Sequence, residues 1–589
     1  MKEAKRLFAL WSDDRKWLAG SLLLTIGGAI GTLSIPLLSA ILIDQGIRTN
    51  DLGVIITYGS YMLVFTLVAA SCQIANTLIA VKFSERTAHY LRISAYARVQ
   101  DLSFANIDRF RPSDLLVRLT NDIQNIKIAI QQGILNLPLV PVMLLITIIL
   151  IAIQSPGLVW LMVLLLVIFS ILLALYLWLV LPVFTRRQEK YDGMNRALQE
   201  NLAGIRVVKA YVRQKYENER FDAVAGDVRA ASLNAQKYIA VLIPTMLFIV
   251  NLALAAIFYI GGVGVLEGTG FSTGEVIAGI QYLFLLLTPF MILGIVLPAI
   301  SAARPSLVRI FEVMDAEPAV KDHQDPVVPD PSAIRGRVVF DHVNFGYTGP
   351  DGSPGPLVLH DISFAAEPGE TIGFLGPTGS GKSTLVNLVP RFYDVTGGSV
   401  TIDGIDVRKF TQEKLREIVG TCLQQPNLFS GTIRENILFA SKEASDTRML
   451  AAAEDADAEG FVRNIPLQYD DAVARRGTNF SGGQRQRLAI ARTLAANPRI
   501  LILDDSTSAC DVATEARIQD AINKRSTGVT KLLVAQRIST VIAADRIILL
   551  ENGRIAAMGT HEELLATSPL YKEIYDSQLG KGITGRSGA

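Results

Sequence analysis

The chain has 589 residues, of which 50% are hydrophobic and only 19% are charged, a composition typical of a membrane part joined to a soluble part. A net charge of +1 gives no reason to expect a nucleic-acid partner. The three cysteines stand far apart and lack the spacing of a metal site, so we expect small buried hydrophobes at these positions.

Six apolar stretches before residue 305 are long enough to cross a bilayer as helices. They cover roughly residues 17–44, 55–80, 130–154, 156–181, 239–266 and 275–301. The charged N-terminal segment has no cleavable signal pattern, so we expect the first stretch to serve as both insertion signal and anchor.

The loops between the stretches differ sharply in charge. The connections after the second and fourth stretches are rich in Arg and Lys, whereas the loops near residues 155 and 270 contain neither. Because positive loops remain in the cytoplasm, we expect a multi-pass protein of the inner (plasma) membrane with both termini cytoplasmic.

The two basic connections are longer than plain turns. Apolar positions repeat in them at helical spacing, as in "LLVRLTNDIQNIKIAI" from Leu115. We therefore expect the membrane helices to continue as long amphipathic helices into the cytosol toward another domain, and the alternative of plain solvated loops fits their length less well.

Polar residues inside the apolar stretches leave two interpretations open, because they either line a substrate cavity or form hydrogen bonds between helices. These residues are Gln73, Asn76, Asn251, Tyr259 and Gln281. The substrate class also stays open among amphipathic drugs, lipids and peptides.

The composition changes at residue 316. A proline-rich stretch, residues 316–336, is typical of a linker between a membrane domain at 1–315 and a soluble domain at 337–578. In the soluble part, short Val, Ile and Leu runs alternate with helical segments, which predicts an α/β domain with a largely parallel sheet. Residues 579–589 are expected to form a flexible tail.

The strongest chemical signal is "GPTGSGKST", which follows the apolar run "TIGFL" and precedes the helix-like "LVNLV". This is a phosphate-binding loop in its required strand–loop–helix context, and it predicts ATP and Mg²⁺ as ligands. Its glycines let backbone N–H groups surround phosphate oxygens, Lys382 bridges the outer phosphates, and the Ser383 hydroxyl ligates magnesium. The loop consists of Gly376, Pro377, Thr378, Gly379, Ser380, Gly381, Lys382, Ser383 and Thr384.

A second motif, "FSGGQRQRLAIARTL" at residues 480–494, joins this loop, "ILILDDSTSACD" and the six apolar stretches. Together they resemble the ATP-binding-cassette (ABC) transporters of the exporter type over nearly the full length. The resemblance implies a six-helix transmembrane domain fused to an α/β P-loop ABC ATPase domain. It also implies that Ser481, Gly482, Gly483 and Gln484 contact ATP held by another subunit.

The same resemblance assigns roles to single residues. Tyr347 matches the aromatic residue that stacks on adenine. Gln424, favoured over its neighbour Gln425 by its distance from "LFSGT", matches the glutamine that senses magnesium. Asp504 matches the acid that organises magnesium, and Asp511 the aspartate that contacts the second subunit, although Cys510 stands where the family usually has Leu.

Two residues depart from the family pattern. Asp505 replaces the glutamate that polarises the attacking water, which retracts the carboxylate by about 1.5 Å, one carbon–carbon bond. Gln536 replaces the histidine near the γ-phosphate. Because losing a positioned catalytic group costs on the order of 10² to 10⁴ in rate, we expect a degenerate site that binds ATP but hydrolyses it slowly.

The signature at Ser481 is intact, so we expect this chain to complete the competent site of a homologous half-transporter in a heterodimer. Such an exporter would move an amphipathic or hydrophobic substrate out of the cytoplasm by alternating access, driven through residues 111–121 and 210–217. The alternatives are an active homodimeric exporter, an ATP-gated membrane regulator or channel, and an importer with the same fold.

Overall fold

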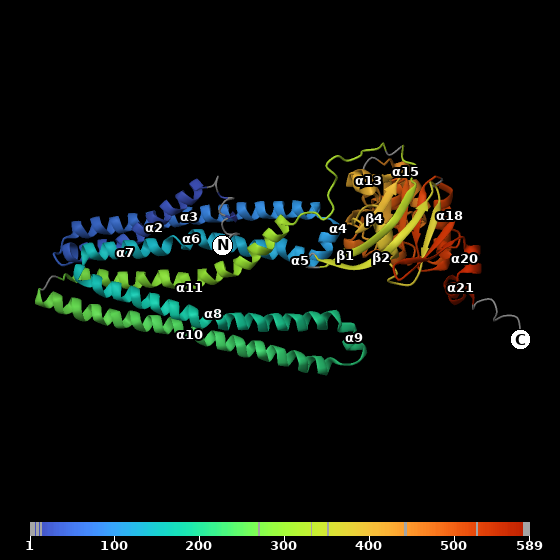
Figure 1. Ribbon diagram of the computed structural model, residues 1–589. Coiled ribbons are helices and arrows are strands. Elements are labelled where there is room, and N and C mark those ends of the chain that lie inside the picture. Colours follow the sequence, from blue (N-terminus) through green and yellow to red (C-terminus); the bar gives the residue numbers. More distant parts are fainter. Residues whose placement is uncertain are drawn as a thin grey trace. The chain divides into compact units, whose positions relative to one another are not determined.

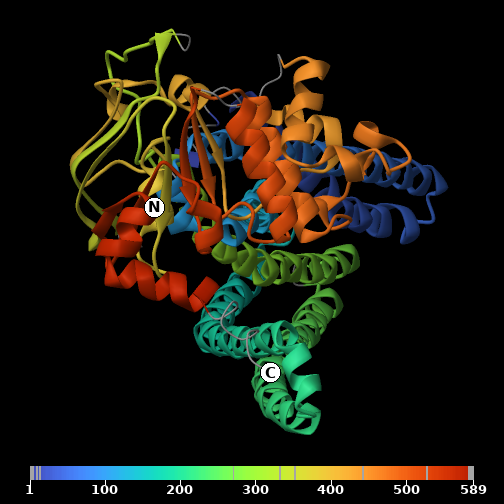
Figure 2. The same cartoon turned by 90° about the vertical axis from the view of Figure 1, so that its right-hand side faces the viewer.

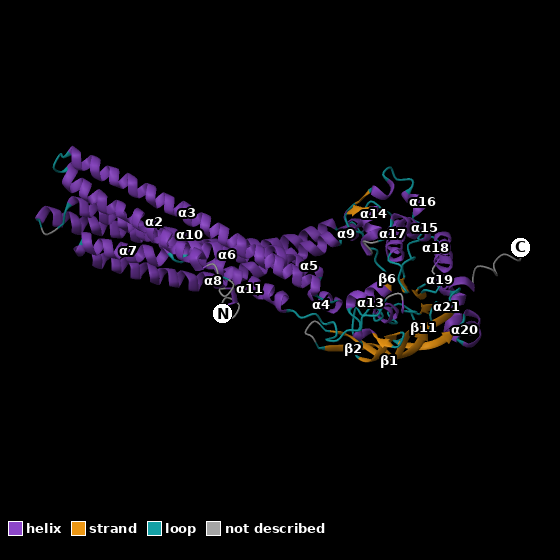
Figure 3. Ribbon diagram, turned by 90° about the horizontal axis from the view of Figure 1, so that it is seen from above, coloured by secondary structure: helices purple, strands orange, loops and turns teal. Residues whose placement is uncertain are grey.

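The computed structural model describes residues 6–7, 11, 15–268, 271–330, 333–349, 353–440, 444–525 and 528–580. The chain divides into two compact units, Met1–Gln100 with Ser113–Asp315 and Asp101–Pro112 with Ala316–Ala589. Within the described residues the first unit is helical and the strands belong to the second unit (Figure 3). The predicted order of a helical membrane part followed by an α/β part is confirmed.

Six helical segments of the first unit are apolar and long enough to span a membrane, as predicted. The longest helices run side by side (Figure 1). The helices are α2 (Arg15–Ile41), α3 (Leu52–Asp101), α5 (Pro112–Val117), α6 (Ile123–Asn136), α7 (Leu139–Gln154), α8 (Val159–Ala203), α9 (Ile205–Ala210), α10 (Gln214–Glu267) and α11 (Thr273–Asp315), with short turns η2 (Leu42–Ile47), η3 (Arg118–Asp122) and η4 (Pro156–Leu158).

Helices α3 and α10 are much longer than a membrane crossing requires. They have 50 and 54 residues, which corresponds to about 75 and 80 Å at 1.5 Å per residue. The hydrocarbon core of a bilayer is about 30 Å thick. Both helices therefore extend well beyond it, as the periodicity of the basic connections predicts.

The spans pack around a common apolar core. Leu33 of α2, Phe169 of α8, Val250 of α10 and Tyr282 of α11 are fully buried in it. The Tyr282 hydroxyl donates a hydrogen bond to the Leu33 carbonyl at 3.1 Å. By contrast, the most apolar stretch of α3 has no buried residue, so its apolar surface is left for lipid or for another chain.

Two of the polar residues in the spans act as hydrogen-bonding partners between helices. The buried Asn76 accepts a hydrogen bond from Ser21 at 2.6 Å and donates one to Thr25 at 3.0 Å. Ser39 donates to Gln281 at 3.2 Å. The structural interpretation therefore holds for these two, whereas three others are exposed: Gln73, Asn251 and Tyr259.

The second unit contains two main sheets. A six-stranded sheet has the order β12 (Arg554–Gly559), β11 (Arg546–Glu551), β3 (Thr371–Leu375), β10 (Thr530–Val534), β9 (Ile500–Asp504) and β6 (Val419–Cys422), with only the β11–β12 pair antiparallel. An antiparallel sheet has the order β2 (Pro354–Ala366), β1 (Val338–Thr348), β4 (Gly397–Ile402) and β5 (Ile405–Asp406). A small pair joins β7 (Gly431–Thr432) to β8 (Ala472–Val473). The predicted parallel sheet is confirmed, while the antiparallel sheet is an addition.

The six-stranded sheet is covered on both faces, which explains its uninterrupted apolar strands. In β9, Ile500 and Ile502 pack with Phe340 of the antiparallel sheet. Leu501 and Leu503 pack on the other side with residues of several helices. The antiparallel sheet and these helices lie on opposite sides of the six-stranded sheet (Figure 2). The helices of the second unit are α4 (Phe104–Phe110), α12 (Lys382–Asn387), α13 (Gln412–Ile418), α14 (Ile433–Ile437), α15 (Asp446–Asp455), α16 (Glu459–Val462), α17 (Gly482–Ala495), α18 (Val512–Arg525), α19 (Ile538–Val541), α20 (His561–Thr567) and α21 (Pro569–Tyr575), followed by the turn η10 (Asp576–Gly580).

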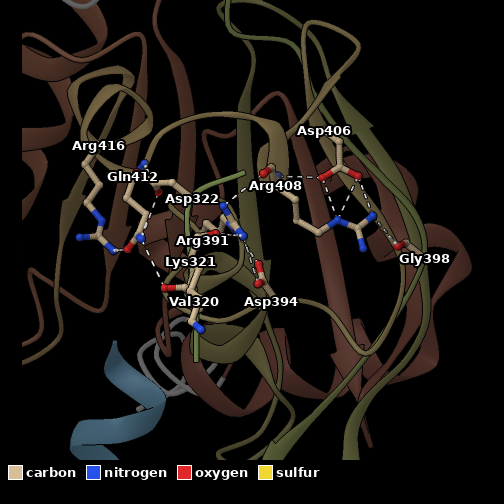
Figure 4. A network of polar contacts seen from close by, with 10 residues as sticks. All are labelled: Val320, Lys321, Asp322, Arg391, Asp394, Gly398, Asp406, Arg408, Gln412 and Arg416. Atoms are coloured by element: carbon tan, nitrogen blue, oxygen red, sulfur yellow. Dashed lines mark hydrogen bonds and ion pairs between the residues drawn. The ribbon is translucent and has the colours of Figure 1, made fainter. Parts of the chain in front are cut away.

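The first half of the proline-rich segment 316–336 is held against the second unit. Arg391, which is only 4% exposed, donates to the Lys321 carbonyl at 2.9 Å and to Asp394 at 2.7 Å. Asp322 accepts the backbone N–H of Gln412 at 3.0 Å (Figure 4). This part of the segment therefore has a fixed path within the second unit.

Candidate nucleotide-binding site

Four neighbouring parallel strands present the predicted site residues at their carboxyl ends. The phosphate-binding loop follows β3, Gln536 follows β10, Asp504 and Asp505 close β9, and Gln424 follows β6. Because the strand order is β3, β10, β9, β6, these ends meet at one edge of the sheet. They surround a cavity of about 290 Å³, lined by Val358, Thr378, Gly379, Gly381, Lys382, Ser383, Thr384, Gln424, Asp504, Asp505, Val534 and Gln536.

The backbone of the loop requires glycine at two close approaches. Gly376 has φ +147°, and a Cβ there would lie 2.1 Å from the Leu550 carbonyl oxygen. Gly381 has φ +98°, and a Cβ there would lie 2.7 Å from the Leu359 side chain. Larger residues at either position would displace the loop from the cavity.

The loop also presents hydrogen-bond donors suited to phosphate. Lys382 donates from Nζ to the carbonyls of Gly376 at 2.7 Å and Pro377 at 2.9 Å. Burial lowers the pKa of Lys382, and the charges of Asp504 and Asp505 oppose that shift. An anionic ligand would therefore stabilise the charged amine. The buried Ser380 hydroxyl has no partner among the described residues, a further sign that the loop fits an oxygen-rich ligand.

Asp504 and Ser383 form the part of the site that fits magnesium. The Ser383 hydroxyl donates to Asp504 at 2.8 Å, and Asp504 is only 3% exposed. Burial raises the pKa of Asp504, so a divalent cation beside it would favour the ionised form. A magnesium ion bound with ATP would be held by Ser383 and Asp504 with Gln424 at the rim, and would supply positive charge to the phosphates.

The two residues that depart from the family pattern contact each other. Gln536 donates from Nε2 to Asp505 Oδ2 at 2.9 Å, and Gln424 donates to the same oxygen at 3.3 Å. Burial raises the pKa of Asp505, an effect opposed by these amide hydrogen bonds and by the charges of Lys382 and Arg537. The neighbouring Gln425 does not line the cavity.

One residue that the sequence did not single out fixes the segment around Gln536. Gln578, in the turn η10, donates from Nε2 to the Gln536 carbonyl at 3.0 Å. Its Oε1 accepts the backbone N–H of Ile538 at 2.8 Å. Gln578 carries no sequence signal because it stands 42 residues downstream in a polar stretch without a motif.

Tyr347 lies beside the loop rather than inside the cavity. Its hydroxyl forms a hydrogen bond with the Thr384 hydroxyl at 2.9 Å. The edges of Phe345 and Tyr393 pack near its ring, with centroids 5.0 and 5.3 Å away. The side chain remains 38% exposed, so adenine stacking on this ring stays a prediction.

The signature segment begins a helix of its own. Ser481 caps α17, accepting the backbone N–H of Gln484 at 3.3 Å while the Gln484 side chain accepts the N–H of Ser481 at 2.9 Å. Gly483 passes the Ala509 carbonyl so closely that a Cβ would lie 3.0 Å from it. None of Ser481, Gly482, Gly483 and Gln484 is among the described residues lining the cavity of this chain's own loop.

Asp511 caps the next helix. It accepts the backbone N–H of Thr514 at 2.9 Å, and this hydrogen bond lowers the pKa of Asp511. The preceding Cys510 is buried, and its Sγ lies 4.0 Å from the Gly483 carbonyl oxygen. The unusual cysteine therefore packs beneath the signature, and it is a small buried hydrophobe as expected.

The first basic connection contacts the ATPase part through α4. Phe104 stacks on Phe392 with ring centroids 4.2 Å apart, and the Tyr393 hydroxyl donates to Asp108 at 2.7 Å. Asn106 donates to the Glu317 carbonyl at 3.0 Å and accepts the N–H of Ala319 at 2.9 Å. Residues 104–110 therefore pack as part of the second unit. Transmission of movement through residues 111–121 and 210–217 stays a prediction.

Six spans, a phosphate-binding loop and a separate signature helix define an ATP-driven membrane transporter with its ATPase in the same chain. The chain belongs to the ABC transporter family. Residues 18–290 match the family model of the ABC transporter transmembrane region, and residues 359–508 match that of the ABC transporter.

Relatives and a solved structure agree over nearly the full length. An uncharacterized ABC transporter ATP-binding protein of Mycobacterium tuberculosis is 34% identical over 580 residues, 98% of each chain. A fatty acid ABC transporter ATP-binding/permease protein of Mycobacterium bovis is 33% identical over 515 residues, 87% of this chain and 79% of the relative. The structure of a bacterial Atm1-family ABC exporter with ATP bound superimposes with a TM-score of 0.79 at 26% identity, covering 96% of this chain and 99% of that one. The protein is thus a multi-pass ABC exporter with fused membrane and ATPase domains.

Proposed function

We propose that this chain is the degenerate-site subunit of a heterodimeric exporter. Its own loop would bind ATP and hydrolyse it slowly, while its signature would complete a competent site on a homologous half-transporter. The observation that carries the proposal is the contact between Gln536 and Asp505 at 2.9 Å.

This contact bears directly on the chemistry of hydrolysis. A general base must reach the attacking water with a free lone pair. Asp505 is one methylene shorter than glutamate, and its Oδ2 already accepts amide hydrogen bonds from Gln536 and Gln424. Gln536 has no ionisable group with which to stabilise the γ-phosphate. Both effects slow hydrolysis without removing the loop residues that bind ATP.

The signature supports the second half of the proposal. Ser481 is exposed at the start of α17, and its capping interactions with Gln484 fix its backbone. Exposed N–H groups at a helix start suit phosphate oxygens from another chain. In a homodimer both composite sites would contain Asp505 and Gln536, which would leave the transporter without a fast site.

Transport would follow alternating access between two states. ATP bound at both composite sites would draw the two ATPase domains together, and α4 would pass this movement to α3 and α5. Hydrolysis at the partner's site would reset the cycle while ATP retained on this chain biases the closed state. With the ATPase domain and both termini in the cytoplasm, an amphipathic or hydrophobic substrate would leave it, and the fatty acid relative supports this class.

The test compares ATP hydrolysis by the purified chain alone with hydrolysis by the chain co-expressed with homologous half-transporters from the same genome. We expect activity only in the pair, and we expect it to survive Asp505→Asn. Robust turnover by the chain alone, abolished by Asp505→Asn, would instead establish an active homodimer.

A further inference from the structure

The first unit contains an apolar cavity of about 820 Å³ that shares no lining residue with the nucleotide site. Helices α2, α6 and α11 form its walls together with two residues of the N-terminal segment, Leu7 and Trp11. Typical wall residues are Leu18, Ile130 and Leu307. The volume falls within the range of about 300 to 1,000 Å³ found for sites that bind drug-sized molecules.

The cavity lies at the end of the sixth span. In the sequence, α11 has no charged residue between Glu275 and Arg304, so Arg304 is the first charge beyond the apolar stretch. Arg304 lines the cavity, and so does the aromatic ring of Trp11. Arginine and tryptophan are the side chains that mark the boundary between hydrocarbon and headgroups. This pair of residues is the pattern expected of a cavity that opens at headgroup depth.

Arg304 differs from the other arginines nearby. Arg309 is held by Asp122 at 2.7 Å, and Arg118 is paired with Glu312 at 2.8 Å. Arg304 is exposed and forms no hydrogen bond or ion pair with any described residue. No carboxylate is among the described residues lining the cavity, whose other polar groups are the Ser301 hydroxyl and the Trp11 indole N–H. Within the described residues the walls are thus mostly apolar, and Arg304 is a cation without a counter-charge.

This combination complements one kind of ligand. An apolar wall gains from burying methylene groups, and a free guanidinium forms strong paired hydrogen bonds with carboxylate or phosphate oxygens. We propose that the cavity binds a single-chain anionic amphiphile, a long-chain carboxylate, with its chain along α6 and its headgroup on Arg304. Its use as a loading place for the exported substrate rests on the proposed function, whereas binding itself does not.

Trp11 provides a direct readout of occupancy. We would replace the other three tryptophans (Trp17→Phe, Trp160→Phe, Trp178→Phe) in the full chain and place it in discs of zwitterionic phosphatidylcholine. A brominated long-chain carboxylate should quench Trp11 fluorescence saturably. A brominated alkyl-trimethylammonium of equal length should bind at least about tenfold more weakly, because its headgroup is repelled by Arg304. The assay uses neither nucleotide nor partner, so its result is independent of the ATPase test.

Three variants of the cavity and one control complete the test. Arg304→Gln should weaken carboxylate binding about tenfold or more, and Arg304→Glu should reverse the preference toward the cationic amphiphile. Gly133→Leu should abolish binding by filling the cavity from α6. Arg229→Gln, which changes an exposed arginine of α10 outside the cavity, should change nothing.

Three results would overturn the proposal. They are the absence of saturable quenching in a chain that melts like the parent, equal affinity of the parent and Arg304→Gln for the carboxylate, and equal quenching by phosphatidylcholine that carries brominated chains. The last result would identify a two-chain bilayer lipid as the occupant instead.

Discussion

Gln536 and Asp505 form a hydrogen bond of 2.9 Å across the carboxyl ends of two neighbouring strands, β10 and β9. Each residue departs from the family pattern, and the structure joins them into one unit. The Gln536 amide donates to a carboxylate oxygen of Asp505, so a change at either position alters the surroundings of the other residue. Changing either residue alone should therefore restore less activity than changing both.

The double change tests this coupling. In a heterodimer whose partner carries an inactivating change in its own catalytic glutamate, Asp505→Glu with Gln536→His should raise ATP hydrolysis by about 10²-fold or more, because it supplies both a base within reach and a charged group near the γ-phosphate. Steady-state phosphate release measures the rate. Gln536→His alone is the control and should give a much smaller gain. Equal rates for the single and double variants would contradict the coupling.

Because the Ser380 hydroxyl has no hydrogen-bond partner among the described residues, we expect its removal to weaken ATP binding without lowering the stability of the nucleotide-free protein. Ser380→Ala should leave thermal unfolding without nucleotide unchanged, since no hydrogen bond is lost in that state. It should weaken ATP binding about tenfold, because a hydroxyl bonded to a charged phosphate contributes more than a neutral pair. Calorimetric titration with ATP measures the affinity. Ser383→Ala, which removes the bond to Asp504, should change both properties. Unchanged ATP affinity in Ser380→Ala would rule out this role for the hydroxyl.

Changing Asn106 should reduce the amount of substrate moved per ATP without slowing ATP hydrolysis itself. Asn106→Ala removes its hydrogen bonds to the Glu317 carbonyl and the Ala319 N–H, together with the cap that its Oδ1 forms with Ser103. The change so loosens α4 from the segment that follows α11. We expect ATP hydrolysis within about twofold of the parent but several-fold less substrate moved per ATP, measured in proteoliposomes of the heterodimer. Each lost hydrogen bond is worth about 1 kcal/mol. The control, Asn464→Ala, changes an exposed asparagine bonded only to the nearby Gly460 carbonyl. A normal transport ratio in Asn106→Ala would argue against α4 as the link.

The interactions of Asp457 with two arginines should make the stability of the ATPase part depend on pH. Hydrogen bonds from Arg517 lower the pKa of Asp457, and Arg487 of α17 adds to the effect. Because the folded-state pKa lies below the unfolded value of about 3.9, the folded state binds fewer protons. The stabilisation is therefore present at neutral pH and is lost as the pH falls through the folded-state pKa. Asp457→Asn should lower the melting temperature of the ATPase part at pH 7, and the difference from the parent should shrink in acid. A constant difference would mean that the charge of Asp457 contributes nothing.

The elements that the sequence predicts best are those whose pattern lies within one continuous segment. The strands β3, β9 and β10 are uninterrupted apolar runs, and the loop after β3 is a dense local pattern, so both follow from the residues alone. The run that forms β1 is apolar enough to predict a strand, but its antiparallel pairing does not follow from the sequence, because polar residues such as Asp341 and His342 interrupt its alternation at irregular registers.

The features that the sequence does not predict depend on contacts between segments far apart in the chain. The importance of α4 depends on Tyr393, which meets Asp108 from 285 residues away, and neither residue signals the other. The role of Gln578 likewise depends on the fold that brings η10 to Gln536. The hydrogen bond between Gln536 and Asp505 follows from the pairing of β10 with β9, which apolar runs alone do not specify.

Slow hydrolysis at the loop of this chain is tested most directly by identifying the nucleotide that the heterodimer retains. The heterodimer would turn over radiolabelled ATP with magnesium and then be rapidly separated from free nucleotide. We expect about one equivalent of intact ATP per heterodimer, held at the loop of this chain, with ADP at the partner's site. Retention of ADP alone at both sites would contradict it, because Asp505 would then support hydrolysis as well as the partner's base does.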